Sequence, residues 1–231
     1  MRFSPPLLLA LLGLAASHPS RAEDTPRKDK PAASLKKTTA NGEQATINRG
    51  IEEPGGWNPP MLAMADLHTI SLEEFCRTFK DAAKYQAFFA AAGKKYAINP
   101  TLLAAIAMEE SHCDPGVSDS GNPANAGGIM QIQGQDEKGS TDPATNILQG
   151  AHELRRHLDG AHGNVLEAVG LYNGWQKGLV VKTMIHPPWG GASMNLDYVH
   201  QVVNGWCQGL EGYDIGSFNK KYNPKFGEQF K

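Results

Sequence analysis

The feature that most constrains the fold is an apolar helical segment that ends in two adjacent glutamates. Asn99 can cap this helix, and Pro100 sits at the first position, where its missing N–H costs no hydrogen bond. The run LLAAIAMEE follows, and almost every residue before Glu109 is apolar or alanine. Apolar stripes at helical spacing continue through both Glu109 and Glu110. We therefore expect one glutamate to face the core and the other to face solvent.

A carboxyl that continues an apolar face near a helix C-terminus should have a raised pKa. Desolvation disfavours its charged form, and so does the negative end of the helix dipole. Such a group stays protonated near neutral pH, as a general acid must. Two glutamates at a helix end are also typical of a plain solvated terminus, and this feature alone favours that interpretation.

Helical patterns also dominate the rest of the chain and predict an all-α domain over residues 62–212. The capping box Ser71-Leu72-Glu73-Glu74 begins a helical pattern that extends to about Gly93. Further helix starts follow at Asp142-Pro143, at Asn164 and at about Asn195. No alternating strand pattern exceeds a few residues. Two Gly-rich stretches, 114–140 and 174–193, resist helix assignment, and loops of this length are usually functional or disordered.

The N-terminal residues 1–22 have the pattern of a secretory signal peptide. Arg2 supplies the positive charge, residues 7–16 are apolar, and Ser20-Arg21-Ala22 offers a cleavage site, with Ala15-Ala16-Ser17 as an alternative. The apolar run is too short to span a bilayer. We expect a secreted, extracellular protein, or a periplasmic one if the source is a Gram-negative bacterium.

The segments that flank the domain have distinct compositions. Residues 23–61, rich in Pro, Lys and Gly, are expected to form a disordered linker. Residues 213–231 are aromatic and basic and are expected to pack back on the domain. The formal net charge of -2 gives no reason to expect nucleic acid as a partner, and we expect a monomer without a membrane span.

The cysteines and histidines indicate structural roles rather than a metal site. Three cysteines in an exported chain suggest one disulfide and one free thiol. Position favours the pair Cys76–Cys207, which would tie the first helix of the domain to the last. Three reduced core cysteines are the alternative. Histidines such as His152 and His157 lack zinc-ligand spacing, so we expect no metal and no cofactor.

Four short motifs occur in a fixed order: Glu110-Ser111, Gly128-Ile129-Met130-Gln131, Asn146-Ile147 with Gly150, and Tyr172-Asn173. Each motif is weak by itself. In this order and spacing, the chain resembles the lysozyme-like superfamily of lytic transglycosylases (SLT domains) and goose-type lysozymes, glycoside hydrolase family 23, over roughly residues 70–210. The resemblance implies an all-α, lysozyme-like helical domain with a substrate groove, acting on the glycan strands of peptidoglycan.

The resemblance also implies catalytic roles. By motif register, Glu110 is the catalytic acid, which would protonate the glycosidic oxygen between N-acetylmuramic acid and N-acetylglucosamine. Tyr172 would lie close to Glu110 and stabilise charge in the transition state. The same register makes Glu109 a bystander, so its replacement by glutamine is expected to have a mild effect.

The resemblance also implies that other residues of these motifs contact substrate, namely Ser111, Met130, Gln131 and Asn173. Ser111 would orient the acid or the sugar, and the backbone near Met130, with Gln131, would bind N-acetyl groups. Asn173 would be a structural hydrogen-bonding partner. Trp175 and Trp189 are either sugar-stacking aromatics or packing anchors.

The motifs leave the reaction type open. In lytic transglycosylases the muramic acid's own 6-hydroxyl attacks C1 and one glutamate serves as acid and base, whereas goose-type lysozymes hold a water on aspartates and hydrolyse. Gln133 stands where goose-type enzymes carry an acidic residue, which favours transglycosylation. Asp119 could still supply a base for hydrolysis. A non-catalytic glycan-binding protein is the third possibility, less favoured because a binder does not need a buried acid.

Overall fold

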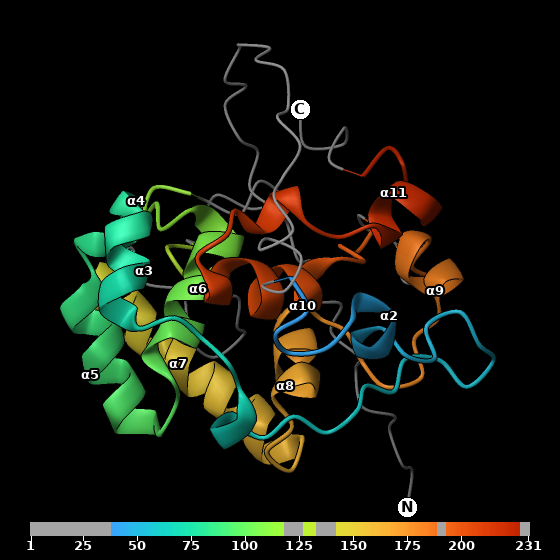
Figure 1. Cartoon of the computed structure of the whole chain (residues 1–231), viewed down its shortest axis with the longest axis horizontal. Helices are drawn as coiled ribbons and strands as arrows, with labels where there is room; N and C mark the ends of the chain where they lie inside the picture. The colour runs from blue at the N-terminus through green and yellow to red at the C-terminus, as the bar shows by residue number, and fades with distance from the viewer. Residues whose placement is uncertain (1–37, 118–126, 133–141, 189–192, 227–231) are drawn as a thin grey trace, which may run out of the picture.

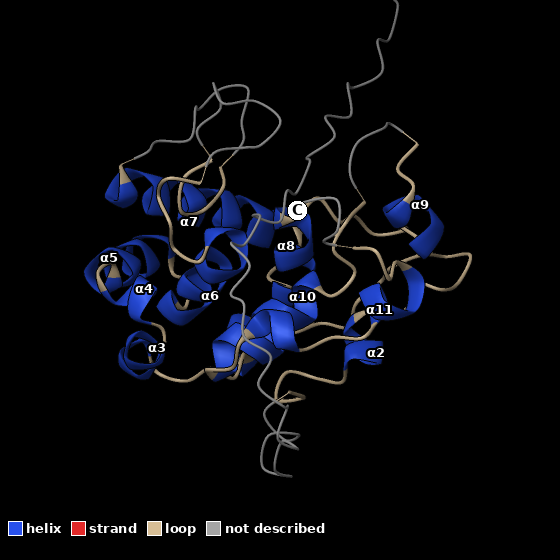
Figure 2. Ribbon diagram, turned by 90° about the horizontal axis from the view of Figure 1, so that it is seen from above, coloured by secondary structure: helices blue, strands red, loops and turns tan. Residues whose placement is uncertain are grey.

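The structure of the chain is a computed structural model that describes residues 38–117, 127–132, 142–188 and 193–226. Within these ranges the regular elements are helices, and no strand occurs (Figure 2). The predicted all-α class is therefore confirmed. None of the helices in the described part combines the length and apolar character that crossing a bilayer requires.

The apolar segment forms the central helix α6 (Pro100–Ser111), which is buried along almost its whole length. The side chain of Asn99 accepts a hydrogen bond from the backbone N–H of Thr101 at 2.9 Å, as expected of a cap. The helix ends where His112 adopts a left-handed conformation. Helices α5 (Gln86–Tyr96) and α7 (Pro143–Gly160) pack beside it (Figure 1).

The helical pattern expected from Ser71 to about Gly93 is divided into three helices, α3 (Leu72–Thr78), α4 (Lys80–Ala83) and α5. Ser71 caps α3 as predicted, because its side chain accepts from the backbone N–H of Glu74. The chain turns extended at Phe79, whose ring packs against that of Trp206 with centroids 5.2 Å apart. A contact with a distant aromatic ring therefore outweighs the local helical pattern.

The two predicted capped starts in the middle of the chain are confirmed. Asp142 caps α7 by accepting from the backbone N–H of Thr145 at 2.9 Å. Asn164 caps α8 (Val165–Tyr172) by accepting from the backbone N–H of Leu166 at 3.2 Å. The irregular stretch that follows contains one short helix, α9 (Val181–Ile185).

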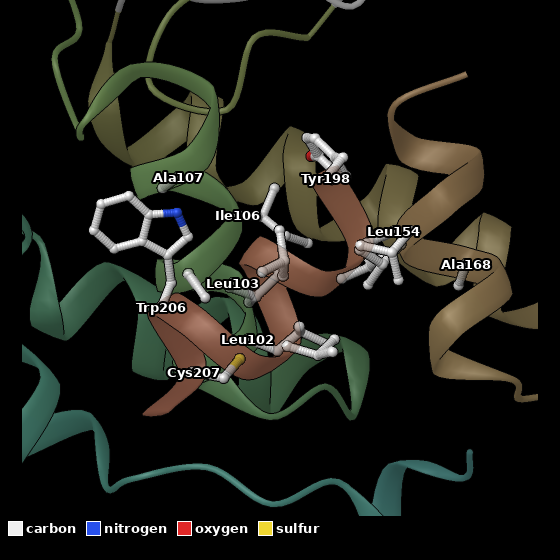
Figure 3. Close-up of a cluster of buried hydrophobic side chains, with 14 of the residues drawn as sticks. Leu102, Leu103, Ile106, Ala107, Leu154, Ala168, Tyr198, Trp206 and Cys207 are labelled. Carbon is white, nitrogen blue, oxygen red and sulfur yellow. The ribbon is translucent and has the colours of Figure 1, made fainter. Parts of the chain in front are cut away.

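The last predicted helix becomes a buried segment with three hydrogen-bond patterns, which we call the C-terminal helical segment (residues 198–208). It comprises α10 (Tyr198–His200), the π-helix η2 (Gln201–Gly205) and the 3-10 helix η3 (Trp206–Gln208). The segment packs on α6. Tyr198, Trp206 and Cys207 of this segment border the apolar cluster around Leu103 and Ile106 (Figure 3). π-Helical turns occur frequently at functional sites.

Residues 38–61 are not a disordered linker, which corrects the expected boundary at residue 62. This stretch contains α2 (Gln44–Ile47), and the 3-10 helix η1 (Met64–Asp66) follows the stretch. Three apolar side chains of residues 38–61 are fully buried, namely Ile47, Ile51 and Trp57. Trp57 Nε1 donates to the carbonyl of Ile47 at 3.0 Å. Few apolar residues occur here, but Ile47, Ile51 and Trp57 pack into the core, so composition alone was misleading. Residues 1–37, with the expected signal peptide, lie outside the described residues.

The described part of the C-terminal tail packs back on the domain, as expected. It contains the 3-10 helix η4 (Gly212–Asp214) and α11 (Phe218–Tyr222). Phe218 is buried, and its backbone N–H donates to Asp197 Oδ1 at 2.8 Å. The tail therefore braces the loop that leads into the C-terminal helical segment.

The predicted Cys76–Cys207 disulfide is wrong, because Cys76, Cys113 and Cys207 are all free and buried. The Cys76 thiol lies 3.9 Å from the carbonyl oxygen of Ala82, whereas Cys207 belongs to the apolar cluster that also contains Leu102 (Figure 3). Burial raises the pKa of the Cys207 thiol. The three thiols therefore act as small apolar core groups.

Candidate active site

Both glutamates at the end of α6 are buried, which corrects the expectation that one of them faces solvent. Glu109 is 3% exposed and Glu110 is 6% exposed. The C-terminal helical segment packs over this end of α6. Tyr213 covers it as well, and its hydroxyl donates a hydrogen bond to the backbone carbonyl of Glu109. Sequence periodicity could not anticipate this cover, because it comes from residues about a hundred positions away.

Glu110 carries the properties that a general acid requires. The hydroxyl of Tyr198 donates a hydrogen bond to Glu110 Oε1. Burial raises the pKa of Glu110 from 4.5 to about 8, and the Tyr198 hydrogen bond partly opposes this rise by stabilising the charged form. The carboxyl is therefore protonated at neutral pH, and its ionised form has a hydrogen-bond donor already in place.

Tyr172 belongs to α8 and contacts the turn at residues 127–132. Its hydroxyl donates to the backbone carbonyl of Met130 at 2.8 Å. Burial raises the pKa of Tyr172, with smaller contributions from the negative charges of Glu110 and Glu153. The phenol of Tyr172 thus stays protonated within electrostatic range of Glu110.

Ser111 links the end of α6 to the turn at residues 127–132. Its hydroxyl donates to the backbone carbonyl of Ile129 at 2.8 Å and lies within hydrogen-bond distance, 3.3 Å, of the backbone carbonyl of Ala107. These hydrogen bonds run to the backbone and not to Glu110, so they fit a role in placing the turn. The expected orientation of the acid or the sugar by Ser111 stays a prediction.

Asn146 of the Asn146-Ile147 motif, on α7, holds the turn at residues 127–132 through hydrogen bonds. Asn146 Oδ1 accepts from the backbone N–H of Met130 at 2.7 Å, and Asn146 Nδ2 donates to the carbonyl of Gly127 at 3.2 Å. Gly150 leaves space for the fully buried Met130, because a Cβ at position 150 would lie 2.7 Å from that side chain. The spacing of the Asn146-Ile147 and Gly150 motif is therefore explained by this contact.

Gln131 is partly buried and braces the same turn. Its backbone has a positive φ of 46°, and its Nε2 donates to the carbonyls of Gly128 at 2.7 Å and Val117 at 3.0 Å. The expected contacts of Met130 and Gln131 with N-acetyl groups stay predictions. Asn173 is buried at the end of α8, where its backbone N–H donates to the carbonyl of Gly170 at 3.1 Å.

The remaining candidates separate clearly. Trp175 is fully buried and packs edge-on against Trp57 with ring centroids 4.9 Å apart, so it is a packing anchor and not a sugar-stacking aromatic. Asp119, Gln133 and Trp189 lie outside the described residues. In the ranges that the structure describes, no group of His, Cys, Asp and Glu side chains is arranged to hold a metal ion.

Sequence reasoning missed three residues behind the site. These residues are Asn195, Tyr198 and Trp206. Asn195 Nδ2 donates to Glu109 Oε1 at 3.1 Å, and Trp206 Nε1 donates to Glu109 Oε2 at 2.6 Å. Burial raises the pKa of Glu109 well above its ordinary value, opposed by the Trp206 hydrogen bond. Helical spacing places Trp206 on one face with Val199 and Val203, but no local signal indicates its polar partner.

Comparison with known families agrees with this geometry. Residues 87–178 match the family model of the transglycosylase SLT domain, which confirms the resemblance to lytic transglycosylases of the lysozyme-like superfamily over this part of the chain. The match extends from α5 to just beyond α8 and includes Glu110, the turn at 127–132 and Tyr172. It supports lytic transglycosylase activity on peptidoglycan in general terms. The C-terminal helical segment lies beyond the matched region.

Proposed function

We propose that this protein is a secreted enzyme that cleaves the β-1,4 bond between N-acetylmuramic acid and N-acetylglucosamine in peptidoglycan by lytic transglycosylation. The observation that carries the proposal is the buried carboxyl of Glu110 at the end of α6, hydrogen-bonded by Tyr198 and near Tyr172. Burial without a positive partner keeps a carboxyl protonated, which suits proton donation and not ion pairing.

The proposed reaction uses Glu110 twice. Protonated Glu110 donates its proton to the glycosidic oxygen as the bond from C1 of N-acetylmuramic acid to that oxygen breaks. The 6-hydroxyl of the same sugar then attacks C1, and ionised Glu110 accepts the hydroxyl proton. A 1,6-anhydro sugar forms, Glu110 regains its proton, and no water is consumed.

The two tyrosines support the intermediate state of this cycle. The hydrogen bond from Tyr198 stabilises Glu110 after it has lost its proton, when the carboxylate would otherwise be buried without a donor. Burial raises the pKa of Tyr198 and Tyr172, so both remain neutral donors while Glu110 cycles between its two forms.

The environment of Glu109 argues against a catalytic role for the carboxyl that neighbours Glu110 in the chain. Most glycosidases use two carboxyl groups, one of which activates water or attacks the sugar. Glu109 is the carboxyl next to Glu110 in the chain, yet each of its oxygens accepts a hydrogen bond from a buried side chain. Glu109 is therefore poorly suited to act as the second catalytic group.

The test is the release of soluble fragments from purified peptidoglycan by the wild type and by Glu110→Gln. We expect release by the wild type and a loss of nearly all of it in the variant. Thr101→Val is a matched control, since it removes a buried hydrogen bond at the opposite end of α6, from Thr101 to the carbonyl of Ile70 at 3.1 Å. Binding of peptidoglycan without release by either protein would support a glycan-binding role and contradict the proposal.

A further inference from the structure

Glu109 connects α6 to both ends of the C-terminal helical segment. Its two carboxyl oxygens accept hydrogen bonds from Asn195, which precedes the segment, and from Trp206, near the end of it. The three side chains are at least nine-tenths buried. Hydrogen bonds to a buried carboxyl are costly to lose, because the unpaired groups remain away from water.

Tyr198 lies between these two attachment points. It follows Asn195 by one helical turn, and its backbone N–H donates to the Asn195 carbonyl at 3.3 Å. Its hydroxyl donates to Glu110, the neighbour of Glu109 on α6. Two consecutive glutamates therefore hold one segment, the first at its ends and the second at the tyrosine between them.

The orientation of Asn195 is fixed by its other partners. Its Oδ1 accepts from the backbone N–H of Asp197 at 3.0 Å and from Asn219 Nδ2 at 2.6 Å. Its Nδ2 donates to Gln201 Oε1 at 2.7 Å as well as to Glu109. The amide group thus presents a donor to Glu109, and the interaction requires an acceptor at that position.

We propose that Glu109 is a positioning residue for the proposed reaction: its carboxyl fixes the C-terminal helical segment on α6 and so holds the Tyr198 hydroxyl against Glu110. The inference rests on the proposed role of Glu110 as the catalytic acid. Contrary to the expectation from sequence, replacement of Glu109 should affect catalysis strongly.

Replacing Glu109 by glutamine should act on the pKa of Glu110 through geometry and not through charge. Burial raises the pKa of Glu109 itself, and the pKa of Glu110 is set by its own burial and by the Tyr198 hydrogen bond, so the substitution alone should leave the pKa of Glu110 in place. Displacement of Tyr198 would raise that pKa, because ionised Glu110 loses its donor. An upward shift of the pKa of Glu110 would therefore report the displacement of Tyr198, whereas an unchanged pKa would mean that Tyr198 keeps its place without Glu109.

Other titratable groups face this pair and stay unchanged in the variant. The negative charges that act on Glu109 are those of Glu110, Glu211 and Asp197. The tyrosines whose pKa is raised by the charge of Glu110 are Tyr172, Tyr198 and Tyr213. Because these groups are common to the wild type and Glu109→Gln, a difference between the pH profiles of these two proteins reports the substitution itself.

The experiment measures kcat and KM for cleavage of soluble glycan strands against pH, for wild type, Glu109→Gln, Tyr198→Phe and the double variant. The side chain of Gln at position 109 has one acceptor oxygen, and its NH₂ group would face either Asn195 Nδ2 or Trp206 Nε1, which are themselves donors. We expect kcat to fall on the order of 10- to 100-fold with little change in KM. The alkaline limb of the pH–rate profile reports the pKa of Glu110. This limb should move to higher pH in both single variants, and it should move no further in the double variant.

A downward or absent shift of the alkaline limb in Glu109→Gln, or a double variant whose shifts add, would overturn the inference. Thr101→Val should leave the limb in place. If Glu109→Gln does not fold, Trp206→Phe removes one attachment without changing charge and should shift the limb upward. A wild-type protein without activity would instead refute the proposed function. If the wild type is active, Glu110→Gln is inactive and the alkaline limb of Glu109→Gln does not shift, only this inference is refuted.

Discussion

Replacing Glu110 by glutamine should abolish cleavage yet stabilise the fold at alkaline pH. Burial raises the pKa of Glu110 in the folded state from 4.5 to about 8. Between these values the folded protein keeps a proton that the unfolded chain has lost. The stability linked to this proton is complete below pH 4.5 and is lost as the pH rises through about 8.

The size of this effect follows from the interval between the two pKa values. Each pKa unit corresponds to about 1.4 kcal/mol, so the interval gives an upper value of about 5 kcal/mol for the loss of stability. Glutamine does not titrate, and its carbonyl oxygen can still accept the hydrogen bond from Tyr198. The free energy of unfolding of Glu110→Gln, relative to wild type, should therefore rise by several kcal/mol between pH 5 and pH 9.

Denaturant unfolding followed by circular dichroism at a series of pH values measures this difference directly. Glu109 and Glu211 also have raised pKa values, so both proteins should lose stability as the pH rises, but the wild type should lose more. Parallel curves for the two proteins would refute the reasoning, because they would mean that the pKa of Glu110 is the same in the folded and unfolded states.

Three further outcomes are expected. Wild-type kcat/KM should decline as the pH rises through about 8, where Glu110 loses its proton, and a decline centred near pH 4.5 in a pH–rate profile would contradict this. Gly150→Ala should cost about 1–3 kcal/mol in thermal unfolding and reduce cleavage, because the new Cβ displaces Met130; unchanged values would argue against the tight contact. Trp57→Ala should cost about 3–5 kcal/mol and expose residues 38–61 to limited proteolysis, and persistent protection would show that Trp57 does not anchor them.

The parts of the fold that sequence predicted well are those fixed by local interactions. The caps at Asn99, Asp142 and Asn164 each bond a backbone N–H within three residues, so short patterns were sufficient to place three helices. The break at Phe79 and the packing of residues 38–61 depend on distant aromatic contacts. Neither leaves a periodic signal in the chain.

The candidate site shows the same division. Motif register selects Glu110 and Tyr172 as candidates, because both lie in short patterns of fixed order. The partner of Glu110 is Tyr198, which is 88 residues away in sequence and belongs to no motif that we recognised. Motif register makes Glu109 a bystander, but its donors, Asn195 and Trp206, lie 86 and 97 residues away in sequence and are invisible to that register. Long-range hydrogen bonds of this kind require the three-dimensional structure.

The most direct test of the central claim is the chemistry of the products when peptidoglycan is digested in water enriched in heavy oxygen. If Glu110 acts alone as acid and base, mass spectrometry should find 1,6-anhydromuramic ends without heavy oxygen, and Glu110→Gln should form none of them. Reducing ends that carry heavy oxygen would contradict the account, because they would show that an activated water, and not the sugar's own hydroxyl, attacks C1.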